Sequence, residues 1–324
     1  MIALVGRRLL ALPMILLLVA FLVFLLAWAS PFDPAEAYVQ GAAAGDALTP
    51  QLREQYEQAW GLDKPMPVQF LNWLERLVQG DLGTSRYLPG VPVTDVLQDR
   101  AYPSLVLLGA ALVTVLVGAL LAGVAAAALR DSPIDWLIRT SAYAATFVPS
   151  FWVALLAVFV FAVELDWLPA AGASDLRSTD AGRVEFRHLI LPTITLALTQ
   201  HGWFTLYVRN TVLEVLREDY VRFAEAQGIG RVAVLFRHAL PNALIPFVTL
   251  IGTHIPELIG GSILIESVFG WPGLGNLTRQ AAIAVDIPLL MAIVLVGATL
   301  VVIGNLAADL LYRVVDPRIR ESLR

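Results

Sequence analysis

The chain has 324 residues, of which 58% are hydrophobic and 15% are charged, and its formal net charge is −5. A soluble domain carries about 25% charged residues, so much of this chain's apolar surface must face lipid. The sequence contains no cysteine, which excludes disulfides, thiolate metal sites, iron–sulfur clusters and a cysteine nucleophile.

Six stretches are apolar and long enough to cross a membrane, which takes about 20 residues of helix. They run roughly over Leu9–Ala29, Leu105–Leu129, Leu137–Val163, Leu189–Val208, Ala243–Ile265 and Ile287–Leu311. The fourth is interrupted by polar residues such as Gln200 and His201, so we expect protein to shield it from lipid. The sequence therefore predicts an all-α membrane protein with six transmembrane helices.

The first span begins like a cleavable signal peptide, because Arg7 and Arg8 precede an apolar run that ends at Ala27-Trp28-Ala29. The hydrophobic region of a signal peptide has about 7–15 residues, and the run here is longer. We therefore expect an uncleaved membrane anchor.

Basic residues close to spans stay on the cytoplasmic side. With the amino terminus inside, the inner segments hold 13 basic and 9 acidic residues, and the outer segments hold 9 basic and 17 acidic residues. Both termini are therefore predicted to be cytoplasmic. The expected organisation is a cytoplasmic terminus with the first span (1–29), an extracytoplasmic segment (30–104), a five-helix core (105–312) that contains a cytoplasmic loop (209–242), and a cytoplasmic tail (313–324).

The extracytoplasmic segment is much longer than a turn between helices requires. One helix is predicted to begin at Pro50 with Thr49 as its N-cap. A second is predicted after Pro67, because Leu71 and Leu74 recur at helical spacing. This segment either packs on the outer helix ends or docks a partner protein.

The inner loop contains a short predicted helix over Asp219–Gln227. Asp219 is expected to cap its first turn, and Gly228 to end it in a left-handed turn. Tyr220, Phe223/Ala224 and Gln227 would share one face, which suits a helix that lies in a groove of another protein. An ordinary surface helix with arginines on anionic lipid is the alternative.

At this loop the sequence resembles permeases of the dipeptide, oligopeptide and nickel branch of the ABC importers. The matching motifs are Asp219-Tyr220-Val221-Arg222, Ala224 to Gly228, Arg237-His238-Ala239-Leu240, Gly260-Gly261-Ser262, Glu266-Ser267-Val268-Phe269, Trp271-Pro272-Gly273-Leu274-Gly275, Asn305-Leu306 and Asp316-Pro317-Arg318, with Gly61-Leu62-Asp63-Lys64-Pro65, Gly80-Asp81-Leu82-Gly83 and Pro149-Ser150-Phe151-Trp152 upstream. The sequence departs from the usual motif at Arg222, Phe223, Glu225 and Gln227.

The resemblance implies the type I importer permease fold in a bacterial or archaeal inner membrane. It implies a pore made with a second homologous permease, two ATPase subunits that bind ATP and magnesium, and an extracytoplasmic solute-binding protein. No cofactor, metal or nucleic acid is expected on this chain. Its solute would be a dipeptide, an oligopeptide, a nickel chelate or a glutathione-like compound.

The resemblance assigns the coupling role to residues of the inner loop, and the other candidate sites follow from the chemistry and position of their residues. The ATPase-coupling residues would be Asp219, Tyr220, Phe223, Ala224, Glu225, Ala226, Gln227 and Gly228. The candidate residues of the translocation path are Gln200, His201, His254 and Glu257, because polar side chains within spans usually face protein or water. His254 and Glu257 lie three residues apart and either pair with each other or contact solute. The outer turn Trp271-Pro272-Gly273 is a candidate contact of the binding protein.

Two other classes of protein remain as alternatives. An intramembrane enzyme is disfavoured because the sequence lacks His-Glu-x-x-His and Gly-x-Ser-x-Gly, and its four histidines are scattered. A proton- or ion-coupled secondary transporter would use Glu257 as its ion site. The sequence also lacks the Gly-x-x-x-x-Gly-Lys-Ser/Thr phosphate loop, so we expect no ATP site of that type on this chain.

Overall fold

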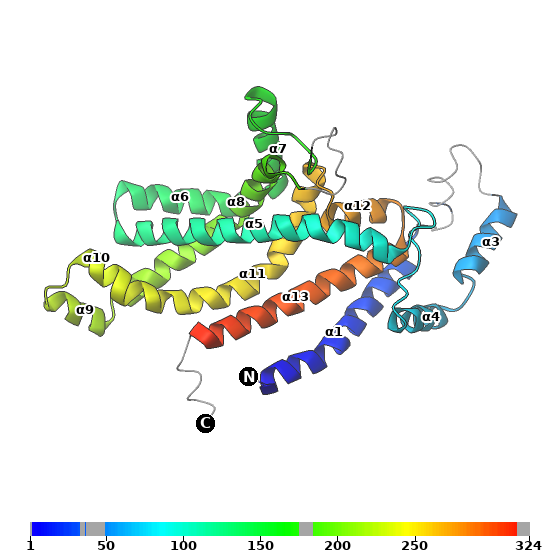
Figure 1. Cartoon of the computed structure of the whole chain (residues 1–324), viewed down its shortest axis with the longest axis horizontal. Coiled ribbons are helices and arrows are strands. Elements are labelled where there is room, and N and C mark those ends of the chain that lie inside the picture. Colours follow the sequence, from blue (N-terminus) through cyan, green and yellow to red (C-terminus); the bar gives the residue numbers. More distant parts are fainter. Residues whose placement is uncertain (1, 33–35, 37–48, 175–183, 316–324) are drawn as a thin grey trace. The chain divides into compact units, whose positions relative to one another are not determined.

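The computed structural model describes residues 2–32, 36, 49–174 and 184–315, and the regular elements in this part are helices (Figure 1). Thr84 and Pro92 additionally form an isolated antiparallel bridge. The chain divides into two compact units, Met1–Ser104 with Pro272–Val302, and Leu105–Trp271 with Ile303–Arg324. The described helices confirm the predicted all-α class.

The first unit contains helices from both ends of the chain. They are α1 (Ile2–Trp28), α3 (Pro50–Trp60), α4 (Met66–Val78), α12 (Leu274–Ile283) and the first parts of α5 (Val93–Ala128) and α13 (Ile287–Val315). Phe24 of α1 packs with Trp73 of α4 and Met291 of α13. Phe70 stacks on Trp73 with ring centroids 5.9 Å apart. The two helices predicted in this segment are confirmed, and α4 begins at Met66, two residues before the expected Val68.

A buried carboxylate organises the turn that precedes α5. Asp286 is fully buried, and its Oδ2 accepts hydrogen bonds from Ser85 Oγ at 2.7 Å and from the backbone N–H groups of Arg86 and Tyr87 at 2.6 and 2.9 Å. Its Oδ1 accepts from the N–H of Leu289 at 3.1 Å, which caps the first turn of α13. One side chain therefore stabilises both a turn and a helix start.

The second unit is built around α8 (Phe186–Val215) and α11 (Leu240–Val268). It also contains α6 (Pro133–Phe147), α7 (Ser150–Ala157), the π-helical segment η1 (Val158–Glu164), α9 (Asp219–Ala226), α10 (Arg231–Val234) and the π-helical segment η2 (Leu235–Ala239). Phe204 and Val208 of α8 pack with Val115 of α5 and Phe247 of α11 in a buried apolar cluster. A Cβ on Gly202 of α8 would lie 2.1 Å from the carbonyl oxygen of Ala142 in α6. The absence of a side chain at Gly202 therefore sets how closely α6 and α8 approach.

Three of the predicted spans coincide with helices long and apolar enough to cross a membrane, over Leu10–Trp28, Val93–Ala128 and Ile287–Leu311. The second starts twelve residues before the predicted Leu105, because Val93, Val96 and Leu97 are buried and extend the helix. The predicted fourth and fifth spans fall on α8 and α11. Neither is among the helices that meet this length and hydropathy criterion within the described residues.

The third predicted span, Leu137–Val163, is not a single straight helix. The helical stretches Pro133–Phe147 and Ser150–Glu164 meet at an angle of 107°. Val148 between them is extended, with ψ of 128°, because Pro149 disfavours the helical conformation of the residue before it. This pair counts as a fourth membrane span only if the broken helix crosses as one element.

Candidate functional site

The short helix α9 lies in the turn that joins α8 to α11. Val221 and Ala224 are buried with Val234 of α10, and Val215 and Leu216 at the end of α8 pack against them. Figure 1 shows α9 and α10 at the same end of α8 and α11. A small apolar core therefore fixes α9 to the helices on either side of it.

The prediction for the C-terminal end of α9 is confirmed, and the prediction for its N-terminal end is wrong. Gly228 has a φ of +83°, in the left-handed region that glycine adopts most easily, so it ends the helix as expected. Asp219 is not the N-cap. It is the first helical residue, and Glu218 occupies the cap position without a side-chain hydrogen bond to the helix. Asp219 can still interact favourably with the positive end of the helix dipole.

The exposed face of α9 differs from the predicted one. Tyr220 and Phe223 are exposed, with 44% and 65% of their surface accessible, but Ala224 faces the core. Asp219, Glu225, Ala226, Gln227 and Gly228 are also exposed. The alanine thus anchors the helix, and the two aromatic rings form its outer surface.

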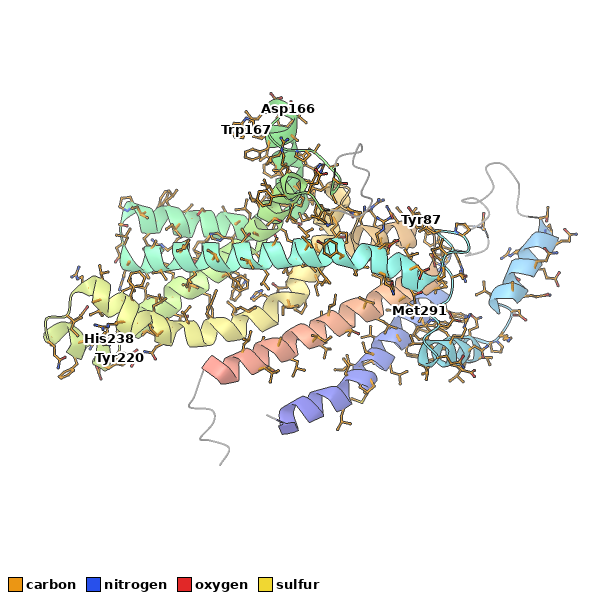
Figure 2. The ribbon with its side chains drawn as sticks, viewed as in Figure 1. Tyr87, Asp166, Trp167, Tyr220, His238 and Met291 are labelled. Carbon is orange, nitrogen blue, oxygen red and sulfur yellow. The ribbon has the colours of Figure 1, made fainter. Side chains whose placement is uncertain are left out.

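The Tyr220 side chain is also held in place. Its hydroxyl oxygen accepts a hydrogen bond from Asn242 Nδ2 at 3.0 Å, and the same amide group donates to the carbonyl oxygen of His238 at 2.9 Å. Figure 2 shows Tyr220 and His238 at this end of the second unit. Asn242 therefore ties α9 to the first turn of α11.

A buried ion pair near the end of α8 was not predicted. Arg209 of α8 donates from Nε to Asp135 Oδ1 at 2.7 Å and from Nη2 to Asp135 Oδ2 at 2.8 Å. Both residues are buried, and the hydrogen bonds from Arg209 hold the pKa of Asp135 at about 2. The two residues are 74 positions apart, so no local sequence pattern reveals the pairing. The pair joins the start of α6 to the end of α8, six residues before the last residue of α8.

The candidate path residues lie on α8 and α11. His254 Nδ1 lies 2.6 Å from Glu257 Oε2, which confirms that these two side chains pair. His201 Nε2 lies 3.1 Å from Thr205 Oγ1 on its own helix. Gln200 of α8 lies beside Gly261 of α11, and a Cβ added to Gly261 would be 3.9 Å from Gln200 Nε2. The structure thus places Gln200 and His254 where α8 meets α11, whereas His201 lies beside Gly118 of α5, where a Cβ would be 3.5 Å from its Cε1.

The candidate contact of the binding protein is only partly accessible. The Trp271 side chain is fully buried, in an apolar cluster with Leu107, Leu258 and Phe269. Gly273 is buried and Pro272 is partly exposed. In this conformation, Trp271 therefore stabilises the core and does not offer its ring to a partner.

Comparison with known proteins places nearly the whole chain. The profile of the family described as binding-protein-dependent transport system inner membrane component matches residues 115–321. A profile for the N-terminal part of such membrane components matches residues 1–88. Together these matches cover most of both compact units.

Curated relatives match over almost their full length. The chain is 38% identical to the oligopeptide transport system permease protein AppB of Bacillus subtilis, over 97% of this chain and 98% of that protein. It is 39% identical to a putative peptide permease protein of Brucella suis, over 97% of both chains. It is 35% identical to a probable peptide ABC transporter permease protein of Sinorhizobium fredii, over 97% of this chain and 98% of that one.

In systems of this kind a separate protein binds the solute, and the membrane component is non-catalytic. The helices that are long and apolar enough to cross a membrane agree with a membrane component. The chain belongs to the family of binding-protein-dependent transport system inner membrane components.

Proposed function

We propose that this chain is the permease subunit of an ATP-driven importer of small peptides. Family membership supports the role as a permease, and the names of the relatives from Bacillus, Brucella and Sinorhizobium support peptides as the solute. The energy comes from two ATPase subunits that bind ATP and magnesium. A second homologous permease completes the translocation path, and an extracytoplasmic binding protein delivers the peptide.

The observation that carries this proposal is the exposure of Tyr220 and Phe223 on a helix that is otherwise anchored. Two large apolar rings exposed on one short helix indicate a docking surface when a rigid scaffold presents them. The occupant is an ATPase subunit, because α9 occupies the position that the resemblance assigns to the coupling helix. Glu225, Gln227 and Gly228 would lie at the edge of the same contact.

The buried Asp135–Arg209 pair supports a mechanical role for this end of the unit. A bidentate pair between α6 and α8 makes the two helices move together, because separating it would leave charges buried without partners. Displacement of α9 by the ATPase would therefore pass through Val215 and Leu216 into α8, and from α8 into α6.

The proposed topology has six spans with both termini in the cytoplasm, in the type I permease fold. The helices α8 and α11 supply the fourth and fifth spans, and their polar residues face the second permease or the water-filled path. The segment 30–104, with α3 and α4, is extracytoplasmic, and the loop 209–242 is cytoplasmic. The C-terminal tail 313–324 lies largely outside the described residues, and we place it in the cytoplasm. Gln200, His201, His254 and Glu257 would line the path, and Pro272 would contact the binding protein.

The test uses the complete transporter in proteoliposomes with labelled trialanine and the purified binding protein. Phe223→Ala should abolish ATP-driven uptake, because the docking surface loses its most exposed ring, and the variant should still insert into the membrane. Val78→Ala, which removes an exposed apolar side chain from α4, should leave uptake unchanged. Uptake that continues without the ATPase subunits would refute the proposal in favour of a secondary transporter.

A further inference from the structure

A polar and aromatic group of side chains lies on the boundary of α8 and α11. The ring of His254 contacts two consecutive aromatic residues of α8, with its centroid 5.4 Å from that of Trp203 and 5.0 Å from that of Phe204. On its own helix, His254 pairs with Glu257 at 2.6 Å. His254 is mostly buried, but 59% of the Glu257 side chain is accessible, as is 53% of Trp203. His254 therefore contacts both the Glu257 carboxylate and the Trp203 ring, and each of these two groups is more than half accessible.

Lipid is an unsuitable environment for this group. Glu257 lies in the middle of the predicted fifth span, and a carboxylate at that depth is several kcal/mol less stable against hydrocarbon than against water or protein. The His254 contact involves Oε2 only, and the described part of the chain places no hydrogen-bond partner on Oε1. The accessible side of Glu257 must therefore face the water-filled path or another polar partner.

Two glycines, Gly260 and Gly261, lie next to Glu257 on α11 and carry no side chains. Gly260, one turn further along α11, has no atom of another residue within 4 Å of the position of a Cβ. Gly261 lies against Leu196 and Gln200 of α8 at 3.4 and 3.9 Å, measured from the same position. The open glycine leaves room for a solute to approach the backbone of α11 next to the carboxylate.

We propose that Glu257 and Trp203 form a site for the ammonium group of a lysine side chain in the transported peptide. This inference rests on the proposed function and adds the chemistry that the permease itself recognises. A carboxylate oxygen accepts a charge-assisted hydrogen bond from the ammonium group, and the face of a tryptophan ring attracts the same cation. His254 is a positioning residue, because its hydrogen bond to Oε2 fixes the orientation of the Glu257 carboxylate.

The experiment compares initial ATP-driven uptake of Ala-Lys-Ala and Ala-Glu-Ala by the complete transporter in proteoliposomes, with the binding protein saturated by either peptide. Saturation removes the selectivity of the binding protein from the comparison. Glu257→Gln should lower the ratio of Ala-Lys-Ala to Ala-Glu-Ala uptake about tenfold, which corresponds to about 1.4 kcal/mol. Glu257→Asp should keep most of the wild-type ratio, because it keeps the charge.

Two further variants separate recognition from folding. Trp203→Phe should change the ratio by less than about twofold, and Trp203→Leu should lower it several-fold, since leucine has no aromatic face. Glu164→Gln, an exposed carboxylate outside this group, is the matched control and should leave the ratio unchanged. ATPase activity stimulated by the binding protein shows that each variant is assembled.

The outcomes are distinct. Absence of peptide uptake by the unmodified transporter would overturn the proposed function and this site with it. Uptake by the unmodified transporter with an unchanged ratio in Glu257→Gln would overturn the site alone. An equal loss for both peptides in Glu257→Gln would show that the pair with His254 is purely structural, which also overturns the site.

Discussion

Removal of Arg209 should be among the most destabilising single changes in the second unit. In Arg209→Met the carboxylate of Asp135 stays buried and loses both of its short hydrogen bonds. Breaking one partner of a buried ion pair costs about 3–5 kcal/mol. The pKa of Asp135, lowered to about 2, has the matching sign, because the hydrogen bonds from Arg209 stabilise its charged form.

The assay is thermal unfolding of the purified protein in detergent, followed by the fluorescence of its eight tryptophans. For a chain of this size each kcal/mol shifts the midpoint by roughly 2 °C, so Arg209→Met should lower it by about 6–10 °C. The matched control is Arg139→Met. Arg139 lies 3.4 Å from Asp135 but is 38% exposed, so its loss should cost less than about 1 kcal/mol. Equal midpoints for the two variants would refute the reasoning.

Two extensions test the cause of this effect. The double variant Asp135→Leu/Arg209→Met should regain most of the lost stability, because no charge remains buried without a partner. The pH dependence has a definite sign. The pKa of Asp135 is depressed in the folded state, so its contribution is complete above pH ~4 and is lost as the pH falls toward 2. Arg209→Met should lose that part of the acid dependence.

Three further variants test other parts of the account. Gly228→Ala should reduce peptide uptake strongly, because alanine at a φ of +83° costs about 1 kcal/mol and displaces the end of α9. Gly230 has a φ of −63°, so the control variant Gly230→Ala should take up peptide as fast as the unmodified protein. Gly202→Ala should lower the amount of folded protein in the membrane, because its Cβ would collide with α6. In the control variant Gly109→Ala the new Cβ meets no atom within 4 Å, so the amount should not change. Equal amounts of the two variants would contradict the packing argument. Asp286→Asn should destabilise the first unit by about 3 kcal/mol, because the amide has one acceptor oxygen and the carboxylate has two. Unchanged resistance of residues 79–92 to protease would contradict this loss of stability.

Local features of the fold were predictable from the sequence. The apolar runs of α1 and α13 and the helix starts near Pro50 and Pro67 follow from hydropathy and from the position of proline. The end of α9 at Gly228 follows from the need for a left-handed residue. Each of these depends on neighbours within a few positions, which a sequence displays directly.

Features that depend on tertiary partners were not predictable. Asp135 and Arg209 look like ordinary charges near a membrane surface until α6 and α8 are packed together. Ser85 and Asp286 are 201 positions apart. Ala224 faces inward because it packs against Val234 of α10. The sequence prediction therefore placed Ala224 wrongly on the exposed face of α9.

The break at Val148 and Pro149 was visible in the sequence but was given too little weight. A proline disfavours helix at the preceding residue, and here it bends the chain by 107°. Hydropathy averaged over the window conceals such a break, because the residues on both sides are equally apolar. A short helix after the outer turn, α12, was also not predicted.

The central claim is that α9 lies in the cytoplasm and contacts an ATPase subunit. The chain has no cysteine, so Ala226→Cys introduces a unique thiol at an exposed position of α9 and keeps both aromatic rings. In the complete transporter, this thiol should cross-link to an ATPase subunit, and in intact cells it should resist a membrane-impermeant maleimide that labels Val78→Cys. Labelling of Cys at position 226 from outside the cell, or no cross-link to the ATPase in the assembled transporter, would contradict the account.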